Sequence, residues 1–290
     1  MLPVADAVLS FWFTHFPVVD GRLFLRNDRC DEAIVCNNSV TDVAALTSLV
    51  HEMRALPRSL VSEARDRELE QMQARLPLLP TNANATRLMP GEGPCHFVES
   101  TQPNTDNGYQ ELYTAWPMEL TGVNRSQPFL PLRVALETSR AVGAAGEPGG
   151  NYPMGAAVLG LGDDAARLLR PYLGKYNTQY SEPMTTTCCG PYGQPSLFPG
   201  FWSAPDGTPV AEHGSTVRLG IHKMLAQSDG RRILLLPAWP AGWGAEFRLK
   251  LPLRTTVTGR VENGTLTRLT VVPAARRADV TIVTGLPPRV

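Results

Sequence analysis

The chain has 290 residues, of which 43% are hydrophobic, so it is long enough to build one large core or two ordinary ones. Lysine plus arginine equals aspartate plus glutamate at 27 each, so no net charge favours nucleic acid or an anionic membrane surface as a partner. No apolar run approaches the roughly 18 residues of a membrane-spanning helix. A neutral ligand such as a sugar is compatible with this composition.

Residues 2–13 predict an amphipathic helix whose apolar face is formed by Val4, Val8, Phe11 and Trp12. The stretch has no basic residues at its start and an acidic residue interrupts it, so we expect no signal peptide. The four Asn-x-Ser/Thr sequons are then interpreted as chance matches. The localisation stays open.

Residues 18–38 are expected to be loop-rich. Thr41 or Asp42 begins an apolar helix that ends before Pro57, and Ser59 caps a second, charged helix. The charge pattern of this pair predicts a helical hairpin and no function.

Residues 77–107 are expected to form a long connection, because proline, glycine and asparagine recur without a period. Further helices are predicted over residues 128–142, 155–161 and 165–172. The glycines of this region match no phosphate-binding loop. The five cysteines show no metal-ligand spacing, so we expect no zinc site and no disulfide framework. We also expect no cofactor.

The periodicity changes near the C-terminus, where short or alternating apolar runs predict strands. These runs are residues 233–236, 246–251, 256–261, 266–271 and 279–283. Residues 262–265 read Glu-Asn-Gly-Thr and predict a hairpin turn. We therefore expect a mainly α chain, with a helical body over residues 1–228 and a small antiparallel β domain over residues 229–290.

Two polar side chains, Glu212 and His213, precede a predicted helix whose N-cap is Ser215. The helix dipole stabilises a carboxylate at this end by about 0.3–1 kcal/mol, which suits a base better than an acid. The alternative is a surface glutamate and a surface histidine at the start of a helix.

The sequence around this helix resembles the C-terminal part of glycoside hydrolases related to family 95, the inverting α-L-fucosidase and α-L-galactosidase group. The helix ends in MLAQ (224–227) and a strand reading LLPAWP (235–240) follows. The resemblance implies that Glu212 stands where the family has its general-base aspartate. It also implies a partial (α/α) six-hairpin toroid over residues 1–228, followed by a small antiparallel β-sandwich.

The resemblance implies further site residues. The general acid would be Asp31 or Glu32, which precede the helix that begins near residue 41. A second block, residues 108–117, resembles a segment that faces the sugar pocket. The candidate substrate-binding residues are Glu111, Trp116, Trp202, Asp206 and His213. For Trp116 the alternatives are a ring that stacks on a pyranose and a core aromatic.

The function implied by the resemblance is inverting hydrolysis of a glycosidic bond in an oligosaccharide, such as an α-L-fucoside, by a carboxylate pair. Relatives are often secreted or periplasmic. Because the chain begins directly with a helix, it also suggests a truncated domain, which another chain could complete. The alternative is a non-catalytic remnant that binds carbohydrate or is purely structural. A polysaccharide lyase would instead use a tyrosine or histidine base.

Overall fold

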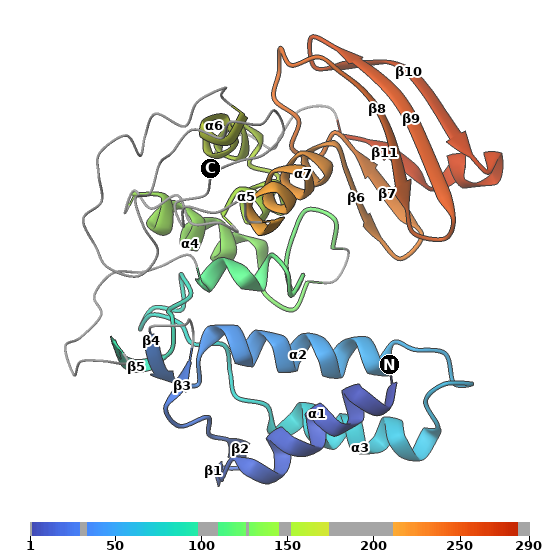
Figure 1. Ribbon diagram of the computed structural model, residues 1–290. Coiled ribbons are helices and arrows are strands. Elements are labelled where there is room, and N and C mark those ends of the chain that lie inside the picture. Colours follow the sequence, from blue (N-terminus) through green and yellow to red (C-terminus); the bar gives the residue numbers. More distant parts are fainter. Residues whose placement is uncertain are drawn as a thin grey trace. The chain divides into compact units, whose positions relative to one another are not determined.

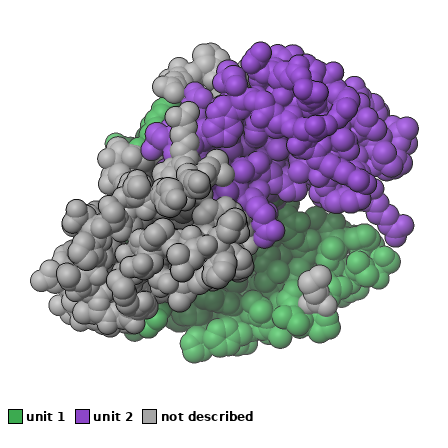
Figure 2. All heavy atoms as spheres, turned by 45° about the horizontal axis from the view of Figure 1, so that its top comes forward, with its two compact units in different colours: residues 1–121, 128–149 green, residues 122–127, 150–290 purple. Residues whose placement is uncertain are grey.

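The computed structural model describes residues 2–29, 34–97, 110–125, 128–144, 152–173 and 211–283. Its backbone divides into two compact units (Figures 1 and 2). Unit 1 contains residues 1–121 and 128–149, and unit 2 contains residues 122–127 and 150–290. None of the described helices is both long enough and apolar enough to cross a membrane.

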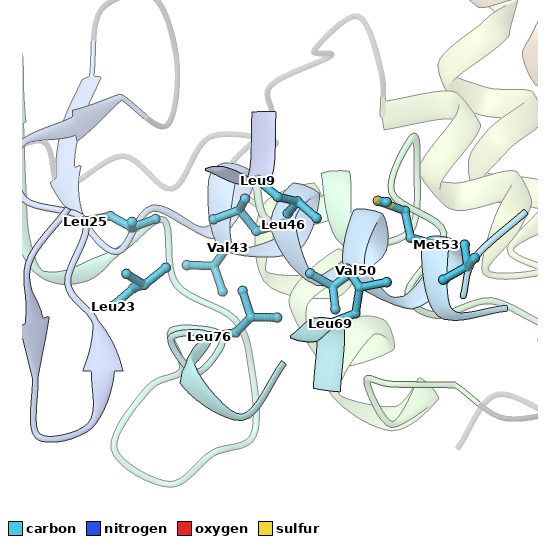
Figure 3. Packing of buried hydrophobic residues seen from close by; sticks show 10 residues of the cluster. Leu9, Leu23, Leu25, Val43, Leu46, Val50, Met53, Leu69 and Leu76 are labelled. Atoms are coloured by element: carbon cyan, nitrogen blue, oxygen red, sulfur yellow. The ribbon is translucent and has the colours of Figure 1, made fainter. Parts of the chain in front are cut away.

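Three helices build the core of unit 1, namely α1 (Leu2–His15), α2 (Val40–Arg54) and α3 (Glu63–Arg75). The predicted helical hairpin is present as α2 and α3, but each helix begins at a different cap. Ser39 and Ser62 accept the capping hydrogen bonds, in place of the predicted Thr41 or Asp42 and Ser59. The buried side chains gather along α2 in Figure 3, and they include Leu9, Val43, Leu46, Val50, Met53, Leu69 and Leu76.

Helix α1 is present as predicted, but three of the four residues of its predicted apolar face, Val4, Val8 and Phe11, are exposed. Val4 is 68% exposed and Phe11 is 53% exposed, whereas Leu9 is fully buried. The residues that pack on the core beside Leu9 are Leu2, Ala5, Trp12, Phe13 and Phe16. Apolar residues occur on several sides of this helix, so its periodicity allows more than one buried stripe.

Short strands replace part of the loops predicted in unit 1. β1 (Val18–Val19) and β2 (Arg22–Leu23) form a hairpin. β4 (Ile34–Asn37) lies between β3 (Asp28–Arg29) and β5 (Glu92–Phe97), and it runs antiparallel to both.

A disulfide joins the neighbouring strands β4 and β5. It links Cys36 to Cys95, and both residues are buried. Gly91 packs against it, since a Cβ at that position would lie 2.9 Å from the Cys36 Sγ. The expectation of no disulfide framework did not foresee this bond, because its two cysteines are 59 residues apart in the sequence and meet only where β4 pairs with β5.

Unit 1 is completed by two further helices. The short 3₁₀ helix η1 (Gln110–Thr114) packs against both α2 and α4 (Leu132–Ala144). Thr138 on α4 accepts a hydrogen bond from the backbone N–H of Leu88 at 2.9 Å, which fixes the connection before β5 to this helix.

Unit 2 contains three helices that pack on one another, α5 (Tyr152–Val158), α6 (Gly162–Leu173) and α7 (Ala211–Leu225). Helix α7 begins four residues before the predicted cap, so Ser215 lies inside the helix. The small residues of α5 and of the start of α6 allow close approach. A side chain at Gly162 would lie 2.6 Å from the carbonyl oxygen of Ala238.

Two three-stranded sheets follow in unit 2. One contains β6 (Ala226–Asp229), β7 (Arg232–Leu235) and β11 (Val280–Ile282), and the other contains β8 (Ala245–Leu251), β9 (Thr255–Glu262) and β10 (Thr265–Val272). Residues of both sheets share one apolar cluster, which includes Ile233, Leu235, Phe247, Val257 and Val261. The strands β8 to β10 run antiparallel as predicted, whereas β11 pairs in parallel with β7.

The predicted fold class, a mainly α chain that forms part of an (α/α) toroid, is wrong. The described residues contain several small sheets, and two of these lie among the N-terminal helices. No ring of helical hairpins is formed within the described ranges. The expectation failed because strands of two to six residues are too short to show an alternating pattern.

Candidate functional site

The carboxyl of Glu111 is held on η1, between α2 and α4 of unit 1. Three polar residues of this single turn, Gln110, Glu111 and Thr114, are at least 98% buried. The Thr114 hydroxyl donates to the carbonyl oxygen of Glu111 at 2.8 Å. Buried polar side chains usually have hydrogen-bond partners, but the Glu111 Oε2 has none among the described residues.

Burial raises the pKa of the Glu111 carboxyl to about 7. A hydrogen bond from its own backbone N–H and the positive charge of Arg87 act in the opposite direction, but they are smaller effects than desolvation. Near neutral pH the carboxyl therefore exists in both protonation states. Such a group can donate or accept a proton, and carboxyls with this property are found in active sites.

A second pair of carboxyls lies at the start of α2, and no pattern in the sequence indicates it. Asp42 forms a side-chain hydrogen bond with Asp28, and burial together with this neighbour raises the pKa of Asp42 to about 8. Ser39 connects the two residues, because its backbone N–H donates to Asp28 at 3.2 Å and its hydroxyl accepts from the Asp42 N–H at 3.2 Å. Only the contact between β3 and the cap of α2 brings these carboxyls together.

Unit 1 also contains a cavity of about 560 Å³, which neither of these two carboxyls lines. Asn38 and Glu92 are among its lining residues, and the Asn38 amide donates to the Glu92 carboxylate. The Asn38 carbonyl oxygen accepts from the Leu25 N–H at 2.8 Å, so both ends of this buried amide are occupied. The polar groups on this wall are therefore satisfied within the protein.

The residues predicted from the resemblance are distributed over several parts of the chain. Asp31, Glu32, Trp202 and Asp206 lie outside the described residues. Glu111 and Trp116 lie in the same segment of unit 1, where Glu111 is buried and Trp116 is half-buried. The half-buried Trp116 fits neither alternative fully, and its role as a sugar platform stays a prediction.

Glu212 and His213 lie in unit 2, in the first turn of α7. The described side chains of this helix begin only at Val217, so the structure describes neither of the two. The backbone position agrees with a carboxylate near a helix N-terminus, where free N–H groups and the dipole favour a negative charge. Its role as a base stays a prediction.

Within the described ranges, no three side chains of histidine, cysteine, aspartate or glutamate gather closely enough to hold a metal ion. The expectation of a site without metal or cofactor stays a prediction. No model of a known protein family matches the chain, and no curated protein matches it. The resemblance to family 95 therefore stays a prediction from the sequence.

Proposed function

We propose that the protein hydrolyses a glycosidic bond of an oligosaccharide, with Glu111 as the proton donor. An inverting glycosidase needs one carboxylic acid that is protonated at the working pH and one carboxylate that activates water. The observation that carries the proposal is the buried Glu111 carboxyl, whose pKa is raised to about 7 and whose Oε2 has no partner among the described residues.

Glu111 serves as the acid because its carboxyl has the property that Asp31 and Glu32 were expected to supply. A carboxyl with a pKa near 7 keeps a substantial protonated fraction at neutral pH, whereas an exposed glutamate is almost fully ionised there. Trp116 follows five residues later and offers an aromatic surface for the apolar face of a sugar. The motifs around α7 support Glu212 as the base.

The test is release of reducing sugar from a panel of α-L-fucosides, α-L-galactosides and plant oligosaccharides. We expect activity in the wild-type protein and a loss of at least about 100-fold in Glu111→Gln and in Glu212→Gln. The matched control is Glu63→Gln, which removes an exposed carboxyl from the first turn of α3 and is expected to keep full activity. The wild-type rate should also fall as pH rises above about 7, because the acid loses its proton.

One observation favours a second candidate function, carbohydrate binding without catalysis. The Glu111 side chain is only 1% exposed, so a bound sugar does not reach it in this structure. A binding protein would retain oligosaccharides without releasing reducing ends. Binding by the folded protein with no hydrolysis in any member of the panel would refute the enzymatic proposal and support this second function.

A further inference from the structure

A second cavity of unit 1 has a markedly basic lining. It has a volume of about 690 Å³ and is lined by Thr86, Arg87, Arg133, Glu137, Arg140 and Ala141. Three arginines and one glutamate leave a surplus of two positive charges, in a chain whose net charge is zero. The volume lies in the range of small-molecule sites, roughly 300–1,000 Å³. A cavity of this size and charge therefore suits a compact anionic ligand better than an extended polymer.

The arginines are contributed by two elements that a hydrogen bond holds together. Arg133, Glu137 and Arg140 follow at i, i+4 and i+7, so they lie on one face of α4. Arg87 comes from the connection before β5, and the neighbouring Leu88 N–H donates to Thr138 of α4 at 2.9 Å. The opposite wall of the cavity is thereby fixed to the helix.

The turn that carries Arg87 is also preorganised. The side-chain oxygen of Asn82 accepts from the backbone N–H groups of Thr86 at 2.8 Å and of Arg87 at 3.1 Å. An asparagine that bonds to its own turn in this way restricts the backbone. Because the backbone at Arg87 is already fixed, only the side chain of this residue loses conformational entropy when it binds an anion.

The charges of the cavity are only partly compensated. Arg140 pairs with Glu137 within α4, where both side chains are about half exposed. Arg133 has no ion pair among the described residues, and the positive charge of Arg87 acts on the buried carboxyl of Glu111. Two guanidinium groups thus remain to bind a carboxylate, for which their planar donor arrangement is well suited.

We propose that this cavity binds the carboxylate of an acidic sugar, so that the oligosaccharide recognised by the protein contains uronic acid residues. The inference rests on the proposed carbohydrate function, which it deepens by naming the class of substrate. Arg87 connects the basic cavity to the proposed proton donor, because it lines the cavity and its positive charge acts on the Glu111 carboxyl. Arg133 and Arg87 would hold the carboxylate, and Arg140 would add to the positive field.

The test is isothermal titration calorimetry with trigalacturonate, with the matching neutral galactose trisaccharide, and with inorganic phosphate. We expect trigalacturonate to bind at least about fivefold more tightly than the neutral sugar, and Arg133→Met and Arg87→Met each to remove most of this preference. Because Arg133 is exposed, Arg133→Met should fold normally, which far-ultraviolet circular dichroism would verify. The matched control is Arg248→Met on β8, an exposed arginine of unit 2, which should leave binding unchanged.

Three results of the titrations would overturn the inference. They are equal binding of the acidic and neutral trisaccharides, an acidic preference that both variants retain, and competition by phosphate at concentrations as low as those of trigalacturonate. The last result would identify a site for free anions. Hydrolysis of neutral glycosides without an acidic preference would refute this inference and leave the proposed function intact. Binding of trigalacturonate through Arg133 without hydrolysis of any substrate would refute catalysis and leave the acidic-sugar site intact.

Discussion

The two units differ in how a buried ionisable side chain is hydrogen-bonded. In unit 2 the guanidinium of Arg276 is only 6% exposed, and it donates to the hydroxyl of Thr255, the carboxylate of Asp279 and the carbonyl oxygen of Arg231. In unit 1 the Glu111 carboxyl is 1% exposed, and one of its oxygens has no partner among the described residues. A fully paired charge is what structural stability requires, whereas an unpaired carboxyl costs stability and is a mark of functional sites.

The same contrast extends to how each unit holds its strands. The strands β8, β9 and β10 are seven or eight residues long and pair along their length. The strands β3 and β4 contain two and four residues, and the disulfide and the Asn38 side chain fix their surroundings. Unit 1 therefore depends on a few individual side chains, and single substitutions should affect the units differently.

Removal of the disulfide should have the largest effect and should be confined to unit 1. The Cys36→Ala/Cys95→Ala variant opens a loop of 59 residues, which by chain entropy costs about 4 kcal/mol. Hydrogen exchange read by mass spectrometry would follow residues 34–97 and residues 245–272 separately. We expect faster exchange in the first segment only. Equal destabilisation of the second segment would show that the units unfold together and would break the comparison.

Replacement of the paired cation should have the next largest effect, in unit 2. Arg276→Met removes the buried partner of Thr255 and leaves Asp279 with only the exposed Arg231, and the loss of one member of such a network costs about 3 kcal/mol. The adjacent exposed residue supplies the control, since Arg277→Met should change the free energy of unfolding by less than about 0.5 kcal/mol. Urea denaturation of both variants measures this difference. Equal stabilities would mean that the network around Arg276 contributes nothing.

The sequence predicts those parts of the fold that depend on local chemistry. The hairpin between β9 and β10 forms at residues 262–265, and its central residues, Asn263 and Gly264, adopt the positive φ angles of 48° and 72° that this residue pair favours. The helices α2 and α3 could also be predicted, because their apolar stripes and serine caps lie close together in the sequence. The exact caps were missed, since several serines and threonines near each start compete.

The candidate site could be predicted only in part, because its properties depend on residues far apart in the sequence. Glu111 was found through a motif, but its raised pKa arises from the packing of η1 against α2 and α4. Asp28 and Asp42 meet only after β3 has paired with β4. The arginine cavity combines residues 86 and 87 with α4. No period or spacing in the sequence indicates that these residues lie close together in the fold.

The smallest predicted effect concerns the response of unit 1 to pH. The pKa of Asp42 is raised from an ordinary value of 3.8 to about 8, so between these values the folded protein holds a proton that the unfolded chain has released. The free energy of unfolding should therefore fall as pH rises through this window. Asp42→Asn cannot ionise, so it should stabilise the protein by about 1–2 kcal/mol at pH 8.5, after allowance for the solvent that reaches this side chain.

The stabilisation by Asp42→Asn should vanish at low pH. This pH dependence distinguishes an effect of proton binding from an effect of changed packing. At pH 4 the wild-type Asp42 is protonated in the folded state, so Asp42→Asn should then have nearly the wild-type stability. Urea denaturation at pH 4, 6.5 and 8.5 would measure both proteins. A stability difference that is independent of pH would show that the Asp28–Asp42 contact does not hold a proton. Asp42 would then be ionised in unit 1, as Arg276 is in unit 2, and the contrast between the units would depend on Glu111 alone.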